Sequence, residues 1–185
     1  MEIRLANRYK ELAPKLMSDL GLDNVMEIPR IQKVVINAGI GNIKDNREHI
    51  EAFEHDLSVI AGQKVSVRKA RLSEAGFNLR KGANVGLTVT LRNQSMWTFL
   101  DKLINIALPR VRDFSGVSTT SFDAFGNYSL GILEHTIFPE VNPNVVKSIR
   151  GLQITVVVRA KNSAHSKALL QELGMPFRKD SKING

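Results

Sequence analysis

The feature that most constrains the fold of this chain is a two-residue alternation of apolar side chains with small, polar or charged ones. It is clearest over residues 85–92 (VGLTVTLR) and over residues 152–159 (LQITVVVR). Residues 31–38 and 64–70 follow the same pattern. Because successive side chains of a strand point to opposite faces, the alternation predicts four strands of a sheet with one packed face and one open face.

Four other segments repeat their apolar residues at helical spacing. We expect helices over residues 5–20 and 46–61, from about residue 95 to a point before Pro109, and over residues 164–173. Pro14 should kink or restart the first helix, Gly62 suits the position just past the second, and Asn93 reads as the cap of the third. Helices with an apolar stripe should cover the packed face of the sheet. The expected fold is therefore α+β, with a mostly antiparallel sheet and an open polar and basic face.

The length of 185 residues suits one ordinary domain, and the 43% of apolar residues provides for a sizeable core. We expect a single domain over residues 1–178. Residues 179–185 are short and polar, and are expected to form a flexible tail.

If the predicted strands share one sheet, their polar side chains gather on the open face. The expected set is Lys33, Asn37, Lys64, Arg68, Thr88, Thr90, Arg92, Gln153, Thr155 and Arg159. Lys and Arg attract phosphates, whereas Asn, Gln and Thr can contact sugar hydroxyls and base edges. The alternative is a plain solvated face, but such faces mix acids with bases, and this set contains no acid. The pattern favours a surface that binds a polyanion.

The charge of the chain supports the same interpretation. Lys and Arg number 26 against 18 acids, which gives a net charge of +8 and a pI near 9.9. Residues 64–92 hold seven of these bases and a single acid, Glu74. An excess that served solubility alone would be spread out, whereas a concentrated one indicates a nucleic acid first and an anionic membrane second.

Two loops are candidates for direct contact with such a partner. The first strand ends in Asn37-Ala38-Gly39-Ile40-Gly41, and a glycine-rich turn lets a phosphate or ribose approach the backbone closely. This turn is not a P-loop, and an ordinary turn is the alternative reading. Residues 71–84, with Arg80 and Lys81, read as a mobile basic loop between two strands, or as an ordinary exposed loop.

Other classes of function find little support. The absence of cysteine excludes disulfides and thiolate zinc sites, and no apolar run approaches the roughly 20 residues of a membrane span. His49 and His55 are six residues apart and would point to different sides of a helix, so they cannot share a metal. No catalytic motif appears. We expect no catalytic residue, no metal, no cofactor and a cytoplasmic location.

Several motifs give the chain a specific resemblance. They are Pro109-Arg110-Val111-Arg112-Asp113-Phe114, Ser121-Phe122-Asp123, Gly126-Asn127-Tyr128-Ser129, Phe138-Pro139-Glu140, Thr88-Val89-Thr90-Leu91-Arg92, Arg150-Gly151-Leu152 and Pro176-Phe177-Arg178-Lys179. With these, in order over nearly the whole chain, the sequence resembles the bacterial large-subunit ribosomal protein five family. The resemblance implies a protein of the central protuberance that attaches 5S rRNA to 23S rRNA. It also implies contacts with P-site tRNA, neighbouring central-protuberance proteins and a small-subunit head protein.

The resemblance also implies roles for residues. The implied rRNA contacts are Asn37, Gln63, Thr90 and Arg92, with Lys64, Arg68 and Lys69 at phosphates. The glycine-rich turn after the first strand adds Gly39 and Gly41 to the expected rRNA contacts. The tRNA-side loop is Arg71, Gly76, Phe77, Arg80 and Lys81. The chain departs from the family pattern at Ser115, at Ala124-Phe125, and at Leu72 and Glu74, which make the loop less basic.

Three alternatives stay open at this point. One is an assembly or RNA-chaperone factor that visits ribosomes transiently. An RNA-modifying or hydrolytic enzyme would need a titratable cluster that the sequence does not offer. An aromatic-stacking RNA recognition module would need rings where these strands carry Thr and Arg.

Overall fold

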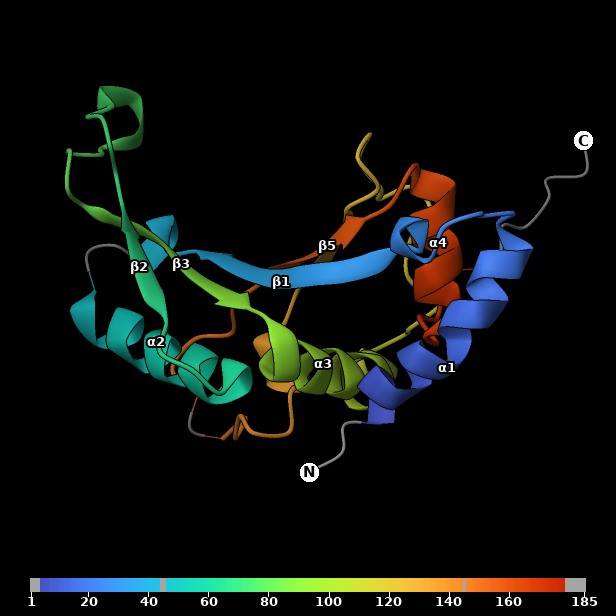
Figure 1. Ribbon diagram of the computed structural model, residues 1–185. Helices are drawn as coiled ribbons and strands as arrows, with labels where there is room; N and C mark the ends of the chain where they lie inside the picture. Colours follow the sequence, from blue (N-terminus) through green and yellow to red (C-terminus); the bar gives the residue numbers. More distant parts are fainter. Residues whose placement is uncertain (1–3, 44–45, 145, 179–185) are drawn as a thin grey trace, which may run out of the picture. The chain divides into compact units, whose positions relative to one another are not determined.

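A computed structural model describes residues 4–43, 46–144 and 146–178 (Figure 1). The chain forms two compact units. Unit 1 comprises Met1–Val34, Arg92–Leu130 and Thr155–Gly185, and unit 2 comprises Val35–Leu91 and Gly131–Ile154. The expectation of one domain over residues 1–178 stays a prediction. The expected flexible tail, residues 179–185, lies outside the described residues.

The strands form one antiparallel five-stranded sheet in the order β2-β3-β1-β5-β4. They are β1 (Arg30–Gly39), β2 (Ser66–Lys69), β3 (Asn84–Leu91), β4 (Tyr128–Ile132) and β5 (Leu152–Arg159). The predicted α+β class and all four predicted strands are confirmed, although β2 is shorter than expected and leaves Lys64 outside it. Strand β4 was not predicted from the sequence. Its end residues, Tyr128 and Ile132, are buried, and its Gly131 is exposed.

The four main helices are α1 (Arg4–Asp19), α2 (Arg47–Ala61), α3 (Asn93–Lys102) and α4 (Ser163–Glu172). All four were expected. The side chain of Asn46 caps α2, accepting from the backbone N–H of His49, and Gly62 ends this helix in the left-handed conformation. Beyond α3 the chain continues as a π-helical turn (Leu103–Ala107) and a 3₁₀ turn (Leu108–Arg110) that contains Pro109.

Two helix predictions need correction. Pro14 does not restart the first helix, because α1 runs through it without a break. Both Pro14 and Lys10, whose carbonyl loses its helical partner, are exposed, so water can replace the missing hydrogen bond. The side chain of Asn93 does not cap α3. It is the first residue of that helix, with φ of 49°, and Arg92 precedes it without a side-chain cap.

Unit 1 holds three helices in contact. α1 packs against both α3 and α4. The rings of Tyr9 and Trp97 lie 5.5 Å apart between their centroids, and the Tyr9 hydroxyl donates to the carbonyl oxygen of Pro29 at 3.2 Å. The exposed ion pairs Arg4–Asp101 and Lys15–Glu172, both at 2.9 Å, add little stability because water screens them. Burial of the apolar stripes holds the three helices together.

Unit 2 shows the expected packing of a helix on one face of a sheet. Its helix α2 packs against β3, whose Leu87, Val89 and Leu91 are buried. The facing stripe of α2 consists of the buried residues Ile50, Phe53, Leu57, Ile60 and Ala61. In Figure 1 α2 runs along one side of β2 and β3, and the loop between these strands extends from their far end. This packing leaves the opposite face of the strands to solvent.

A candidate nucleic-acid interface in unit 2

The register of the β2–β3 hairpin places the polar residues of both strands on one face. Ser66 lies opposite Thr88, and Arg68 lies opposite Gly86. Residues opposite each other in an antiparallel pair point to the same side, and buried Leu87 points to the other. Arg68 and Ser66 are exposed. The face that turns away from α2 therefore carries hydroxyls and a guanidinium.

Three predicted contact residues differ in how freely they are presented. Asn37 in β1 and Thr90 in β3 are both exposed, as expected. The hydroxyl of Thr88, in contrast, donates to the carbonyl oxygen of Ile36 at 3.2 Å and is half-buried. Thr88 thus ties β3 to β1, whereas Asn37 and Thr90 present their polar groups to solvent.

Gln63 also has a structural bond. Its side-chain amide nitrogen donates to the carbonyl oxygen of Thr90 at 3.1 Å. The bond holds the connection between α2 and β2 against the end of β3, directly before Lys64. Because Gln63 is exposed, its amide oxygen is available for further hydrogen bonds. Gln63 was predicted to contact RNA, but its bond to Thr90 was not predicted.

The turn after β1 has the open backbone that the sequence suggested. Gly39 and Gly41 are exposed, and neither has the positive φ that would require glycine. A Cβ atom added at either position would meet nothing within 4 Å. The fold of the described chain therefore does not require glycine at these two positions, and the space beside them is open to a partner.

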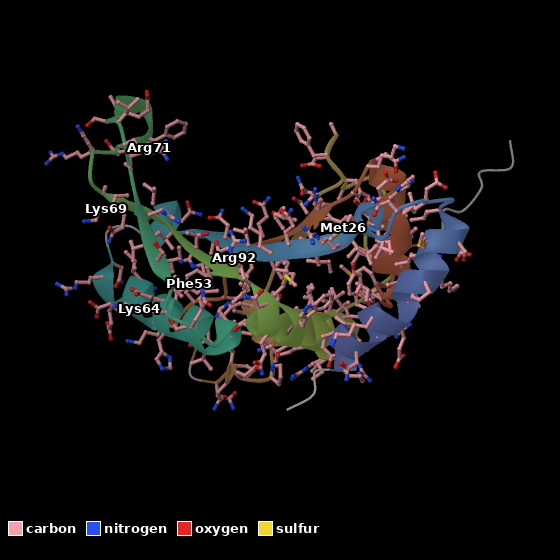
Figure 2. All side chains as sticks on the ribbon, viewed as in Figure 1. Met26, Phe53, Lys64, Lys69, Arg71 and Arg92 are labelled. Carbon is pink, nitrogen blue, oxygen red and sulfur yellow. The ribbon has the colours of Figure 1, made fainter. Side chains whose placement is uncertain are left out.

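The cations of the hairpin lie along its length. Lys64, Lys69 and Arg71 are exposed and follow one another from the base of β2 to the start of the loop (Figure 2). A register shift between Arg68 and Lys69 pairs Lys69 with Asn84, which is the signature of a β-bulge. Arg68 and Lys69, on either side of the shift, are both exposed.

The β2–β3 loop, residues 70–83, has a defined path. It contains a short 3₁₀ helix, Ala75–Phe77, and Glu74 pairs with Leu79 through two backbone hydrogen bonds of 2.8 and 3.0 Å. The backbone N–H of Lys81 donates to the hydroxyl oxygen of Ser73 at 2.9 Å. The predicted tRNA-side residues of this loop, Arg71, Gly76, Phe77, Arg80 and Lys81, are all exposed. Sequence reasoning missed the brace from Ser73.

The acids of unit 2 concentrate on the other side. Helix α2 carries Glu48, Glu51, Glu54 and Asp56. Lys147 lies beside the Glu48 carboxylate and holds the pKa of Glu48 below its ordinary value, while Arg47 contacts Glu51 at 2.7 Å. Since α2 covers the packed face of β3, these carboxylates lie away from the open face. A polyanion that approaches that face meets the bases first.

The predicted sheet set does not fall into one unit. Most of it belongs to unit 2, whereas Lys33, Arg92, Thr155 and Arg159 belong to unit 1. Arg92 is exposed and directly follows β3. The hydroxyls of Thr155 and Ser129 share a hydrogen bond at 3.2 Å. The roles predicted for Arg92 and for the residues of unit 2 stay predictions.

Among residues 4–43, 46–144 and 146–178, no three His, Asp or Glu side chains gather closely enough to hold a metal ion. Within the same ranges, no helix has both the length and the apolar character that crossing a membrane requires.

Comparison with known proteins identifies the family. A family model described as ribosomal protein L5 matches residues 24–80, and one described as ribosomal L5P family C-terminus matches residues 84–177. The chain is 49% identical over 177 residues to large ribosomal subunit protein uL5 of Prochlorococcus marinus (strain AS9601), and 51% identical over 177 residues to that of Thermoanaerobacter sp. (strain X514). Each alignment covers 95% of this chain and 99% of the relative. The chain belongs to the ribosomal protein L5 family, a structural and non-enzymatic component of the large ribosomal subunit.

Proposed function

We propose that this protein binds 5S rRNA through the open face of unit 2 and helps to attach it to 23S rRNA in the central protuberance of the cytoplasmic ribosome. The observation that carries the proposal is the polar and basic face of strands β2 and β3, neither of which contains an acid. Lys64 and Arg68 supply attraction to phosphates there, and Asn37 and Thr90 present uncharged hydrogen-bonding groups. RNA recognition needs both kinds of group, because phosphate contacts give affinity and polar side chains can contact riboses and bases.

The glycine turn and Gln63 support this assignment. The open space beside Gly39 and Gly41 would let a ribose or phosphate come against the backbone. Gln63 holds the base of the hairpin to β3, which fixes the position of Lys64 relative to Thr90. A surface with its groups held in place loses less conformational entropy on binding than a mobile one.

The β2–β3 loop would serve a separate partner. It extends from the end of the hairpin (Figure 1), and its Arg71, Phe77, Arg80 and Lys81 are exposed. We assign this loop to the P-site tRNA. Other surfaces of the protein would contact neighbouring central-protuberance proteins and a small-subunit head protein.

The experiment that tests the 5S assignment is a titration of 5S rRNA with Asn37→Glu and Thr90→Glu variants at several salt concentrations. Each acid would face the phosphates of the bound RNA, so we expect both variants to bind more weakly and to remain folded. His55→Glu, on the exposed side of α2, adds the same charge at a distance and should bind like the parent. If Asn37→Glu and Thr90→Glu also bound like the parent, the sheet face would not be the 5S site.

A second experiment separates the loop from the sheet. Replacing both Arg80 and Lys81 with Gln should leave 5S affinity nearly intact and weaken tRNA-dependent association of the subunits. Lys64→Gln combined with Arg68→Gln is the matched control, because it removes the same charge from the hairpin. We expect that pair to lower the log–log salt slope of 5S binding by roughly 1.4–1.8, at about 0.7–0.9 for each phosphate contact. Equal loss of 5S affinity in both double variants would refute the assignment of the loop and the sheet face to different partners.

A further inference from the structure

The loop before β4 in unit 1 (residues 121–127) turns Phe122 inward and Phe125 outward. Phe122 stacks in a cluster with Tyr128 and Phe177, with ring centroids 4.7 and 6.0 Å away. The Phe125 side chain, only three residues later, is 80% exposed. Exposing a large apolar ring to water costs free energy through the hydrophobic effect, so other contacts must hold Phe125 in its outward position.

The position of Phe125 is imposed by a network around Asp123. One carboxylate oxygen of Asp123 accepts from the backbone N–H of Phe125 at 2.9 Å and of Asn127 at 2.7 Å. The other accepts from the side-chain amide of Asn127 at 2.7 Å. These bonds, that of the Asn127 side chain above all, hold the pKa of Asp123 below its ordinary value, so the carboxylate stays ionised and the loop keeps its shape near neutral pH.

The loop is also fastened to the start of α4 and the end of β5. A Cβ atom added at Gly126 would lie 2.4 Å from the hydroxyl oxygen of Ser166 and 3.4 Å from the carbonyl oxygen of Asn162. The side-chain oxygen of Asn127 accepts from the backbone N–H of Val158 at 3.2 Å. Figure 1 shows the loop beside the first turn of α4. The exposed Arg159 and Lys161 directly adjoin these contact residues in the chain, so their backbone is held close to the loop that carries Phe125.

Positive charge predominates in the two chain segments around Phe125. Between Val117 and Leu133 the only acid is Asp123, whose carboxylate already accepts the three hydrogen bonds described above. Between Val156 and Gln171 there is no acid, whereas Arg159, Lys161 and Lys167 supply positive charge. An apolar pocket on a protein would gain nothing from such cations, but a nucleotide presents both a ring face and a phosphate.

We propose that Phe125 stacks on an unpaired base of RNA while Arg159 and Lys161 contact the adjacent phosphates, which makes unit 1 a second RNA-binding site. The proposal relies on the proposed function only in taking rRNA as the natural partner. Base–aromatic stacking with backbone cations is the usual way in which proteins hold single-stranded RNA, and it needs an aromatic ring already turned to solvent. Duplex RNA offers no such base, so the site discriminates against it.

The test uses the full chain with two probes, a fluorescein-labelled six-nucleotide oligoadenylate and a twelve-base-pair RNA duplex. Ultraviolet crosslinking followed by peptide mass spectrometry locates the oligoadenylate. We expect a nucleotide adduct within residues 122–127 for the oligoadenylate and none for the duplex. Adducts confined to other peptides would overturn the proposal, and so would crosslinks of Phe125 in ribosomal particles to protein alone.

Substitutions make the test quantitative. Phe125→Leu keeps an apolar side chain but removes the ring, and should weaken oligoadenylate binding about 5- to 100-fold, whereas Phe125→Tyr should bind like the parent. Arg159→Gln and Lys161→Gln should each lower the salt slope by roughly 0.7. Leu133→Ala, at another exposed apolar residue, is the matched control and should have no effect. Equal affinities of the Phe125→Leu variant and the parent would overturn the proposal.

The two RNA sites can fail independently. Phe125→Leu should retain the response of 5S binding to Asn37→Glu and Thr90→Glu, because those residues belong to unit 2. A Phe125 adduct in a chain that shows no sheet-dependent 5S affinity would refute the proposed function and leave this inference standing. The opposite pattern would refute this inference alone.

Discussion

Two loops of this molecule each hold an exposed phenylalanine, and they are braced in different ways. The β2–β3 loop carries Phe77, 78% exposed, and is held by backbone hydrogen bonds between Glu74 and Leu79. The loop before β4 carries Phe125, 80% exposed, and is held by the carboxylate of Asp123. The first loop extends from the end of a two-stranded hairpin, whereas the second is packed against α4.

An exposed ring is therefore presented differently by the two loops. Backbone bonds fix the path of the β2–β3 loop, but solvent surrounds nearly every side chain in it, so the loop can adapt to a partner. In the loop before β4, Gly126 and Asn127 are held by neighbouring elements, and Phe125 cannot withdraw without breaking those contacts. A preorganised ring loses little entropy when it binds.

The largest expected difference between the loops is their response to an added methyl group. At Gly126, with φ of 83°, a Cβ atom would approach Ser166 to 2.4 Å, so Gly126→Ala combines backbone strain with overpacking. We expect the free energy of unfolding to fall by about 2–4 kcal/mol. Urea denaturation followed by circular dichroism measures it.

Gly76→Ala in the β2–β3 loop is the matched substitution. Its Cβ atom would meet only a Glu74 carboxylate oxygen at 4.0 Å, and Gly76 has no positive φ. The free energy of unfolding should change by no more than about 0.5 kcal/mol. If both variants lost the same stability, the loop before β4 would not be packed in the way described.

Much of the sheet was predictable because burial on one face imposes a period of two. The alternation in residues 85–91 and 152–159 identified β3 and β5, and Gly62 identified the end of α2. The exposure of Asn37, Thr90 and Arg68 follows from the same alternation. Local rules sufficed here because they agree with the tertiary packing.

Other features depend on contacts between distant residues, which no local pattern records. Strand β4 was missed because its alternation of Tyr128, Leu130 and Ile132 with Ser129 and Gly131 covers only five residues. The hydrogen bond between the hydroxyls of Ser129 and Thr155 joins residues 26 positions apart. No local periodicity distinguishes the inward Phe122 from the outward Phe125, since the partial burial of Phe122 depends on its contact with the distant Phe177. The bond from Gln63 to Thr90 was hidden for the same reason.

The second difference between the loops should appear on acidification. The pKa of Asp123 lies below its ordinary value of 3.8 because the side chain of Asn127 and neighbouring backbone N–H groups donate to its carboxylate. A depressed folded-state pKa contributes stability above the unfolded pKa, and this is lost as the pH falls through the folded value. The bracing of Phe125 should therefore persist at neutral pH, begin to weaken below about pH 3.8, and be lost as the pH falls through the lowered pKa of Asp123.

Amide chemical shifts measured by NMR from pH 7 to pH 2.5 test this expectation. The signals of Phe125 and Asn127 should move together with the titration of Asp123. Those of Lys81 and Ala83 should not follow that titration, because their N–H groups donate to Ser73 and Arg80. In an Asp123→Asn variant the acid transition at Phe125 should vanish. A transition of equal size at Lys81 would contradict the proposed difference in bracing.

The smallest expected effect concerns the side-chain brace that Ser73 gives the β2–β3 loop. Ser73→Ala removes the hydroxyl oxygen that accepts from the Lys81 N–H at 2.9 Å. Since the site is exposed, water can replace the lost bond, and we expect only about 1 kcal/mol of local stability to be lost. Hydrogen exchange at Lys81 should then be about fivefold faster, with the midpoint of urea unfolding unchanged. Ser73→Thr keeps the hydroxyl and should exchange at the parent rate. If exchange also accelerated at Glu74 and Leu79, the hydroxyl of Ser73 and not the backbone pairing would hold this loop, and the contrast between the two loops would be lost.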